Sequence, residues 1–307
     1  MRLRTPEPAR AFVSTRSDAD AGFALVIVLG LMALLAVVSA IVAGSVKAHI
    51  RAASRYAAVA HAQTLAESGI AAASADLRRN WAKFLTSTSQ PSSKEPILCS
   101  FGDSGSVAVR VFDAGGRIDL NSAPAALFEA LLSGLGVDAG AARDIASAIE
   151  AYRASRIEAT ARYRTKVEPP PLPFDTEEAI GQVSGITPRL VRAMMPFITV
   201  YSGVRGLDPV AADPRLLDLL QGGNLTDLPQ ALVGSSTRQT FIITAVARSA
   251  EGGIYGQEAV VRMSRDKRFP MGVEIKSWRP AVFNAAMTPP PRAGGVLCTT
   301  DGVFSPH

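Results

Sequence analysis

A run of 24 residues without a single charge, from Phe23 to Val46, constrains this chain more than any other feature of its sequence. About 20 apolar residues in a helix are enough to cross the hydrocarbon core of a bilayer. Core helices of soluble proteins rarely stay apolar on every side for this length, and the apolar region of a cleaved secretory signal is usually about 7–15 residues long. We therefore expect residues 23–46 to form a transmembrane helix. The sequence holds no second run of this length, which excludes a protein with several spans.

The composition is that of a folded chain. Of the 307 residues, 48% are hydrophobic and 19% are charged, which excludes intrinsic disorder. The 32 basic and 27 acidic side chains give a net charge of +5, a mild excess that does not indicate a nucleic-acid-binding protein. This length allows about two domains.

The sequence offers little for catalysis or for metal binding. Its two cysteines, Cys99 and Cys298, are too few for a four-cysteine zinc site, and its three histidines do not stand at ligand spacing. It contains none of the motifs of P-loop nucleotide hydrolases, zinc proteases or serine hydrolases. We expect Glu150, Glu177 and Glu178 to lie on helices and face solvent. We predict no catalytic residues and no enzymatic activity.

The apolar helix is expected to continue beyond the membrane, because no proline occurs between Pro8 and Pro91. Residues 47–85 are rich in alanine and carry apolar residues at spacings of three and four, the period of one helical face. These residues are Ile70, Ala73, Leu77, Trp81 and Phe84. We predict that this face packs on a globular head.

The head is predicted to be an antiparallel sheet interrupted by a large insert. Alternating apolar residues and turn signals predict one strand before the insert and three after it. The predicted strands are residues 106–112, 240–248, 255–263 and 273–278.

These strands define the predicted domain boundaries. The sheet region comprises residues 86–118 and 236–288, and the insert comprises residues 119–235. Residues 289–307 contain three successive prolines and a Gly-Gly pair, so we expect an irregular tail.

The insert has a helical pattern with two glycine turns. Asn121 or Ser122 is expected to cap its first helix, with Pro124 in the first turn. The turns are expected at Gly136 and at Gly185, which stand in related settings after apolar helical segments.

The start of the apolar run resembles the type IV prepilin signal, also called the class III signal. A polar leader, residues 1–22, ends at Gly22, and Phe23 opens the apolar run. In that family a membrane peptidase on the cytoplasmic face cuts after the glycine, and the new amino-terminal residue is methylated. The resemblance implies that Gly22 and Phe23 form the processing site and that the apolar helix is retained as an anchor.

The fifth mature position departs from the common prepilin pattern. Most members carry glutamate there, whereas this chain has Ile27. A carboxylate in a membrane helix is costly unless it meets a positive partner, which in pilus-like filaments is thought to be the terminal amine of a neighbouring subunit. The absence of the glutamate would suit a subunit at the filament tip.

The insert resembles two families. Its glycine turns are similar to the helix-hairpin-helix modules of DNA-binding competence proteins, in which hairpin N–H groups bind phosphate. Its motifs also resemble protein K of the general secretion pathway, a minor pseudopilin of the type II secretion system. These motifs are residues 117–123 (Arg-Ile-Asp-Leu-Asn-Ser-Ala), 174–178, 185–187 and 198–202.

The combined features favour protein K over a DNA-binding protein. Residues 139–196 hold 8 basic and 7 acidic side chains, a net charge of +1, whereas duplex binding needs a concentrated basic face. A local basic patch at residues 153–166 stays open, with a solvated helix end as its alternative. The resemblance implies an α+β, pilin-like fold. In this fold the long N-terminal helix, transmembrane in its first half, packs on an antiparallel sheet that carries an inserted helical domain of the SAM-like or helix-hairpin-helix-like type.

The resemblance also implies a location and partners. The protein would be a single-pass inner-membrane protein with its head in the periplasm, placed at the pseudopilus tip and helping to initiate assembly for export of folded proteins. Its partners would be other minor pseudopilins, the major pseudopilin, the inner-membrane secretion platform and the prepilin peptidase. The alternatives are a membrane-anchored DNA receptor for uptake and an ordinary single-span protein with an uncut anchor.

Two further features follow from this location and family. In an oxidising periplasm Cys99 and Cys298, as the only pair, could form a disulfide; two unpaired thiols are the alternative. The family implies a possible calcium ion, for which we assign no ligands, because the acidic residues in the loop-rich stretch match no known calcium loop. These residues are Asp208, Asp213, Asp218 and Asp227.

Overall fold

The computed structural model describes residues 18–86, 96–162, 173–221, 229–266, 268–269, 272–283 and 285–290. The chain divides into two compact units, residues 1–56 and residues 57–307. A long first helix, an antiparallel sheet and a helical insert make up the fold. The predicted fold class is therefore confirmed.

The first unit contains the apolar part of helix α1 (Asp18–Thr86). From Leu25 to Val42 every side chain is exposed, and the most apolar window has a mean hydropathy of 3.1. Among the described residues, α1 is the one helix long and apolar enough to cross a membrane. This is the character of a single-pass anchor, because side chains with no protein neighbours are free to contact lipid.

The second unit is built on a five-stranded antiparallel sheet in the order β1-β2-β5-β6-β7. All four predicted strands are confirmed. A fifth, β1, was not predicted, so two strands precede the insert rather than one. The strands are β1 (Ile97–Ser100), β2 (Gly105–Asp113), β5 (Thr240–Ser249), β6 (Ile254–Met263) and β7 (Val273–Pro280).

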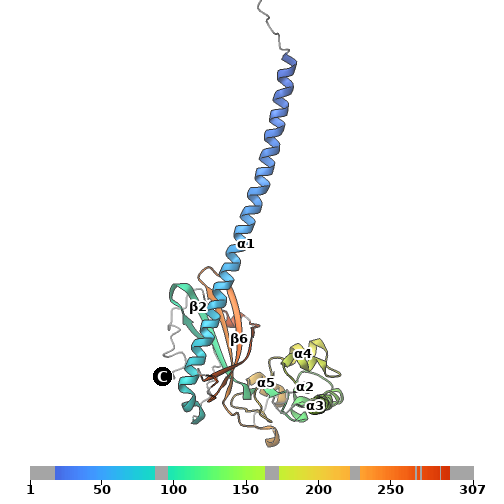
Figure 1. The fold of residues 1–307 in the computed structure, drawn as a ribbon. Helices are drawn as coiled ribbons and strands as arrows, with labels where there is room; N and C mark the ends of the chain where they lie inside the picture. Colours follow the sequence, from blue (N-terminus) through green and yellow to red (C-terminus); the bar gives the residue numbers. More distant parts are fainter. Residues whose placement is uncertain are drawn as a thin grey trace, which may run out of the picture. The chain divides into compact units, whose positions relative to one another are not determined.

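The part of α1 beyond residue 56 packs on one face of this sheet (Figure 1). Ile70, Ala73 and Leu77 are buried there, as their spacing predicts. The helix approaches the sheet closely at Gly69, where an added Cβ would lie 2.9 Å from a methyl group of Val107. Alternate residues of a strand point to opposite faces, so the residues of β2 that alternate with Val107 lie on the face turned away from α1.

The insert forms a second hydrophobic core of its own, with large side chains such as Phe128 and Phe174 fully buried. A short parallel pair, β3 (Ile118–Asp119) with β4 (Ile198–Thr199), joins its beginning to a segment 80 residues later. In Figure 1 its helices gather together. The helices are α2 (Ala125–Gly134), α3 (Ala139–Arg162), α4 (Pro188–Met194) and α5 (Pro214–Gln221).

Short 3₁₀ turns connect these elements. One of them lies where the sequence predicts that Glu177 and Glu178 belong to a helix. They are η1 (Gly102–Ser104), η2 (Ala114–Gly116), η3 (Glu177–Gln182), η4 (Gln230–Leu232) and η5 (Ala285–Met287).

The two glycine turns of the insert have the same backbone conformation. Gly136 and Gly185 both have a φ of +86°, in the left-handed region that favours glycine. The related settings noted in the sequence therefore reflect one turn geometry used twice.

Alanine at these two positions is expected to have unequal effects. At Gly136 nothing lies within 4 Å of an added Cβ, so Gly136→Ala should cost only the backbone strain, about 1–2 kcal/mol. At Gly185 the Cβ would also lie 2.9 Å from Cγ1 of buried Ile145, so Gly185→Ala should cost more. Urea unfolding of both variants tests this order, and equal costs would contradict it.

Candidate functional site: the junction of sheet and insert

Asp119 ties together two motifs that the sequence places 80 residues apart. Its side chain is fully buried at the end of β3. One carboxylate oxygen accepts the backbone N–H groups of Asn121 and Ser122 at 2.8 and 3.0 Å. The other accepts the hydroxyl of Ser202 at 3.0 Å and the N–H of Gly203 at 2.8 Å. The carboxylate thus holds the first segment of the insert against the segment that follows β4.

Asn121 fastens a third motif to the same place. Its amide donates to the carbonyl of Phe174 at 3.0 Å and its Oδ1 accepts the N–H of Phe174 at 2.9 Å. Ser122 donates to the carbonyl of Val204 at 2.8 Å. The prediction that either residue caps the first helix was wrong, because both side chains are used for these long-range bonds. The N-cap of α2 is Pro124, and it makes no side-chain hydrogen bond.

Arg153 is not part of a solvated helix end. It reaches from α3 to the carbonyls of Leu120 and Ala123, and its guanidinium lies over the ring of Phe128 at 5.2 Å. Burial lowers the pKa of Arg153, and the charge of Asp119 partly offsets this. The arginine therefore stabilises the packing of α3 against the first segment of the insert.

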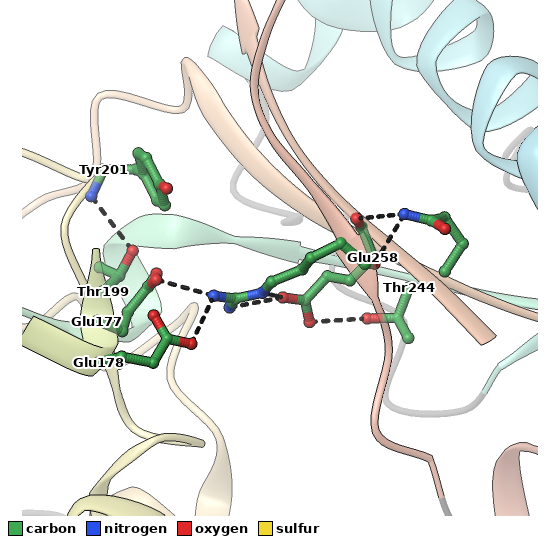
Figure 2. Close-up of polar contacts among 8 residues, drawn as sticks. Glu177, Glu178, Thr199, Tyr201, Thr244 and Glu258 are labelled. Carbon is green, nitrogen blue, oxygen red and sulfur yellow. Dashed lines mark hydrogen bonds and ion pairs between the residues drawn. The ribbon is translucent and has the colours of Figure 1, made fainter. Parts of the chain in front are cut away.

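Arg279 joins the sheet to the insert through three carboxylates. Its guanidinium contacts Glu258 of the adjacent strand at 2.8 Å, Glu177 at 3.0 Å and Glu178 at 3.4 Å. In Figure 2, Glu177 and Glu178 approach from the insert, and Glu258 lies on the sheet beside Thr244. The two bodies of the head are thus connected by charge-assisted hydrogen bonds, which are stronger than neutral ones.

Glu177 corrects a prediction made from the sequence. It was expected to face solvent, but its side chain is 1% exposed, whereas Glu178 is 59% exposed. Glu150 also faces solvent, as predicted, and accepts the N–H of Ala125 at the start of α2. Burial opposes the charge of Arg279, but Glu177 and Glu258 more than offset it and raise the pKa of the guanidinium above its ordinary value.

A second polar link connects the end of β2 to the segment before β5. Asp113, 1% exposed, accepts the hydroxyl of Ser236 at 2.6 Å and the N–H of Gly115 at 2.9 Å, and its second oxygen has no partner. Asp208 accepts the N–H of the same Ser236. Burial raises the pKa of Asp113 above its ordinary value of 3.8, although these hydrogen bonds work in the opposite direction.

Asp113→Asn is expected to be at least as stable as the natural protein at pH 7. A carboxyl whose pKa is raised in the folded state stabilises below its ordinary pKa of 3.8, and this contribution is lost as the pH rises through the folded pKa. The amide oxygen keeps both accepted hydrogen bonds without a buried charge. Urea unfolding should show the advantage of the variant shrinking from pH 7 towards pH 4; a variant less stable by the same amount at both pH values would contradict this.

The described carboxylates do not fit a calcium site. Both oxygens of Asp208 accept backbone N–H groups, of Val210 and Ser236, and Asp213 pairs with Arg215 at 3.1 Å. Within the described ranges no group of three or more His, Cys, Asp or Glu side chains could hold a metal ion. Calcium needs six to eight oxygens, and Asp227 lies outside the described residues. We therefore assign no role to calcium.

The structure describes the predicted processing and disulfide residues only in part. Ile27 is 54% exposed on α1. Gly22 and Phe23 belong to α1, but their side chains are not among those described. Cys99 lies on β1 with 1% exposure, and Cys298 is outside the described residues. Processing after Gly22 and the Cys99–Cys298 disulfide stay predictions.

The hairpin at Gly136 is not arranged to bind phosphate. The N-terminus of α3, which follows it, is already occupied by the carboxylate of Asp138, which accepts the N–H groups of Gly140 and Ala141 at 3.0 and 3.4 Å. A carboxylate in this position would repel the anion that a helix N-terminus otherwise attracts. This geometry disfavours the helix-hairpin-helix interpretation.

Comparison with known proteins identifies the insert. Residues 110–203 match the family model described as Type II secretion system (T2SS), protein K. This part of the chain is therefore similar to protein K. The match begins on β2 and ends at Gly203, so it contains every residue that the carboxylate of Asp119 holds together. The resemblance to protein K drawn from the sequence is confirmed.

Two further comparisons complete this result. No curated protein matches the chain significantly. A solved structure, the GspK-GspI-GspJ complex from the enterotoxigenic Escherichia coli Type 2 Secretion System, matches with 14% identity and a TM-score of 0.49, covering 76% of this chain and 100% of that chain. The protein K assignment rests on the family match.

Proposed function

We propose that this protein is a minor pseudopilin at the tip of a type II secretion pseudopilus, where it helps to initiate assembly for export of folded proteins across the outer membrane. The match of residues 110–203 to protein K carries this proposal. It acts by assembly rather than by catalysis: the polar residues that the motifs bring together hold the insert in place.

The insert supports placement at the tip for a steric reason. A filament shaft stacks similar subunits, and each head is covered by its neighbours. An insert with its own hydrophobic core, fastened to the sheet through Arg279, adds bulk to the head that stacked neighbours would have to accommodate. A subunit of this kind is best suited to the end of a filament.

Ile27 supports the same placement for an electrostatic reason. It stands where most prepilins carry the glutamate that pairs with a neighbouring terminal amine. An isoleucine has no charge to satisfy inside the membrane, so it requires no subunit beyond it. In this proposal the prepilin peptidase cuts between Gly22 and Phe23, and residues 23–46 remain as the inner-membrane anchor.

The head would then lie in the periplasm. There Cys99 and Cys298 form a disulfide that ties the C-terminal tail to β1. The partners are other minor pseudopilins in a tip complex, the major pseudopilin and the secretion platform of the inner membrane.

Co-assembly tests the proposal against DNA uptake. The full-length protein, extracted in mild detergent from cells that produce the matching secretion system, should co-purify with other minor pseudopilins. Its binding to duplex DNA at low salt should not exceed that of a major pseudopilin from the same membranes. Salt-sensitive DNA binding without co-purification would instead support the DNA receptor.

A further inference from the structure

A cleft of about 390 Å³ lies at the seam between the sheet and the insert. Four arginines line it, namely Arg110, Arg117, Arg215 and Arg279, against three carboxylates. We call it the seam cleft. It faces the side of the sheet opposite α1, because Val109 and Val111 point into the core with α1 and Arg110 lies between them.

The carboxylates of the seam cleft are already engaged by two of the arginines. Asp213 pairs with Arg215 at 3.1 Å, and Glu258 and Glu178 pair with Arg279 at 2.8 and 3.4 Å. The charge of Arg110 reaches Asp213, whose pKa it helps to lower, but no bond joins the two side chains.

Arg110 and Arg117 make no ion pair or side-chain hydrogen bond to any part of the chain that the structure describes. Nε of Arg110 is buried without a partner, and the guanidinium lies 5.6 Å from the centre of the Phe112 ring. Burial lowers the pKa of Arg117, and Glu258 and Glu177 only partly offset it. Two partly buried arginines therefore face the seam cleft without a direct ion pair among the described residues.

The strand register shows that the two arginines at the ends of one cross-strand row differ in their carboxylate partners. Arg110, Thr244, Glu258 and Arg279 are direct cross-strand neighbours, in one row across β2, β5, β6 and β7. The arginine at one end of the row has three carboxylates, and the arginine at the other end has none. A carboxylate supplied from outside would complete the row, since arginine binds a carboxylate in a fixed two-pronged geometry.

The walls of the seam cleft also include apolar side chains, which favour a ligand with apolar groups beside its charge. Phe112, Met195 and Met287 line it, and Val282 and Phe283 stand at its exposed rim, at 102% and 37% exposure. A free inorganic anion would leave this apolar surface uncovered, whereas an acidic side chain with apolar neighbours would cover it.

We propose that the seam cleft docks an acidic segment of another subunit of the assembly, in which one Asp or Glu carboxylate pairs with Arg110 and Arg117 while adjacent apolar residues cover Val282 and Phe283. This proposal rests on the proposed function, because the partner is a subunit of the same filament. It adds which surface of this chain meets that partner and which chemistry the partner must offer.

Site-specific photocrosslinking tests the proposal in the full-length protein in membranes of cells that make the complete secretion system. A photoreactive residue at Val282 should crosslink to another pseudopilin, and the crosslinked peptide should contain Asp or Glu beside an apolar residue. Arg110→Gln should lower the yield by at least about tenfold, since one partner of a desolvated charge pair is lost. Arg268→Gln, which removes an exposed arginine paired with Asp266, should leave the yield unchanged.

A second substitution keeps the test decisive if Arg110→Gln does not accumulate. Replacing the identified carboxylate of the partner by lysine should lower the same yield with this chain unaltered. The proposal would be overturned by a crosslinking yield that stays unchanged in Arg110→Gln or in the lysine variant of the partner. A crosslinked peptide without a carboxylate, or a crosslink to this chain's own residues, would also overturn it. Co-purification of minor pseudopilins without any crosslink at Val282 would overturn the docking site alone, whereas loss of co-purification by the natural protein would contradict the proposed function.

Discussion

Replacing Arg279 by methionine is expected to lower the free energy of unfolding of the head by about 3–5 kcal/mol. The substitution removes the cation that satisfies Glu177, which is 1% exposed, and Glu258, which is 15% exposed. Two mostly buried carboxylates would be left without their counter-charge, and this costs more than the loss of one ion pair in water. Urea unfolding of the detergent-extracted full chain measures the effect through the fluorescence of Trp81 and Trp278, which both lie in the head.

Two controls distinguish the loss of the buried ion pairs of Arg279 from the loss of an exposed ion pair. Arg268→Met removes an ion pair whose arginine is 82% exposed, and should cost less than about 1 kcal/mol. Adding Glu177→Gln to Arg279→Met should recover part of the loss, because a neutral amide is cheaper to bury than an unpaired carboxylate. Equal effects of Arg279→Met and Arg268→Met would show that the junction is not held by this network.

Replacing Asp119 by alanine is expected to destabilise the insert by about 3–5 kcal/mol. The fully buried carboxylate accepts four hydrogen bonds, and alanine leaves all four donors without their acceptor. The parallel pair of β3 and β4 should open with them, because Asp119 itself belongs to that pair. Hydrogen exchange should accelerate across the insert more than in β5 and β6.

Asp119→Asn and Asp218→Ala are the matched controls. The asparagine keeps one amide oxygen and so should lose about half as much stability as the alanine variant. Asp218 is an exposed residue on α5, and its replacement should change stability by no more than about 0.5 kcal/mol. An Asp119→Ala variant as stable as Asp218→Ala would show that the buried carboxylate is not what fastens the insert.

The parts of the fold that could be predicted are those with a local periodic signal. The period of three and four in α1 identifies Ile70, Ala73 and Leu77 as the face that packs on the sheet, and alternation identifies the four longer strands. The glycine turns at Gly136 and Gly185 were visible because a left-handed backbone conformation favours glycine. β1 escaped prediction, because its four residues, Ile97–Ser100, are too few to establish a period and it is defined by pairing with β2.

The functional contacts were harder to predict because they join residues far apart in the sequence. Glu177 meets a partner that stands 102 positions later, and nothing near it in the chain marks it as buried. Asn121 was expected to act locally as a helix cap, but its side chain bonds to Phe174, 53 positions away. One signal was available: three of the four motifs that resemble protein K are the segments that the bonds of Asp119 and Asn121 bring together.

Processing of this chain as a pseudopilin can be measured by the intact mass and amino-terminal sequence of the protein extracted from membranes of a host with its prepilin peptidase. We expect a chain that begins with N-methyl Phe23. Gly22→Leu, in the same host, should remain at full length. A chain of the natural sequence that still begins at Met1, in a host that cuts a control prepilin, would show that it is not processed as a pseudopilin and would favour an ordinary single-span anchor.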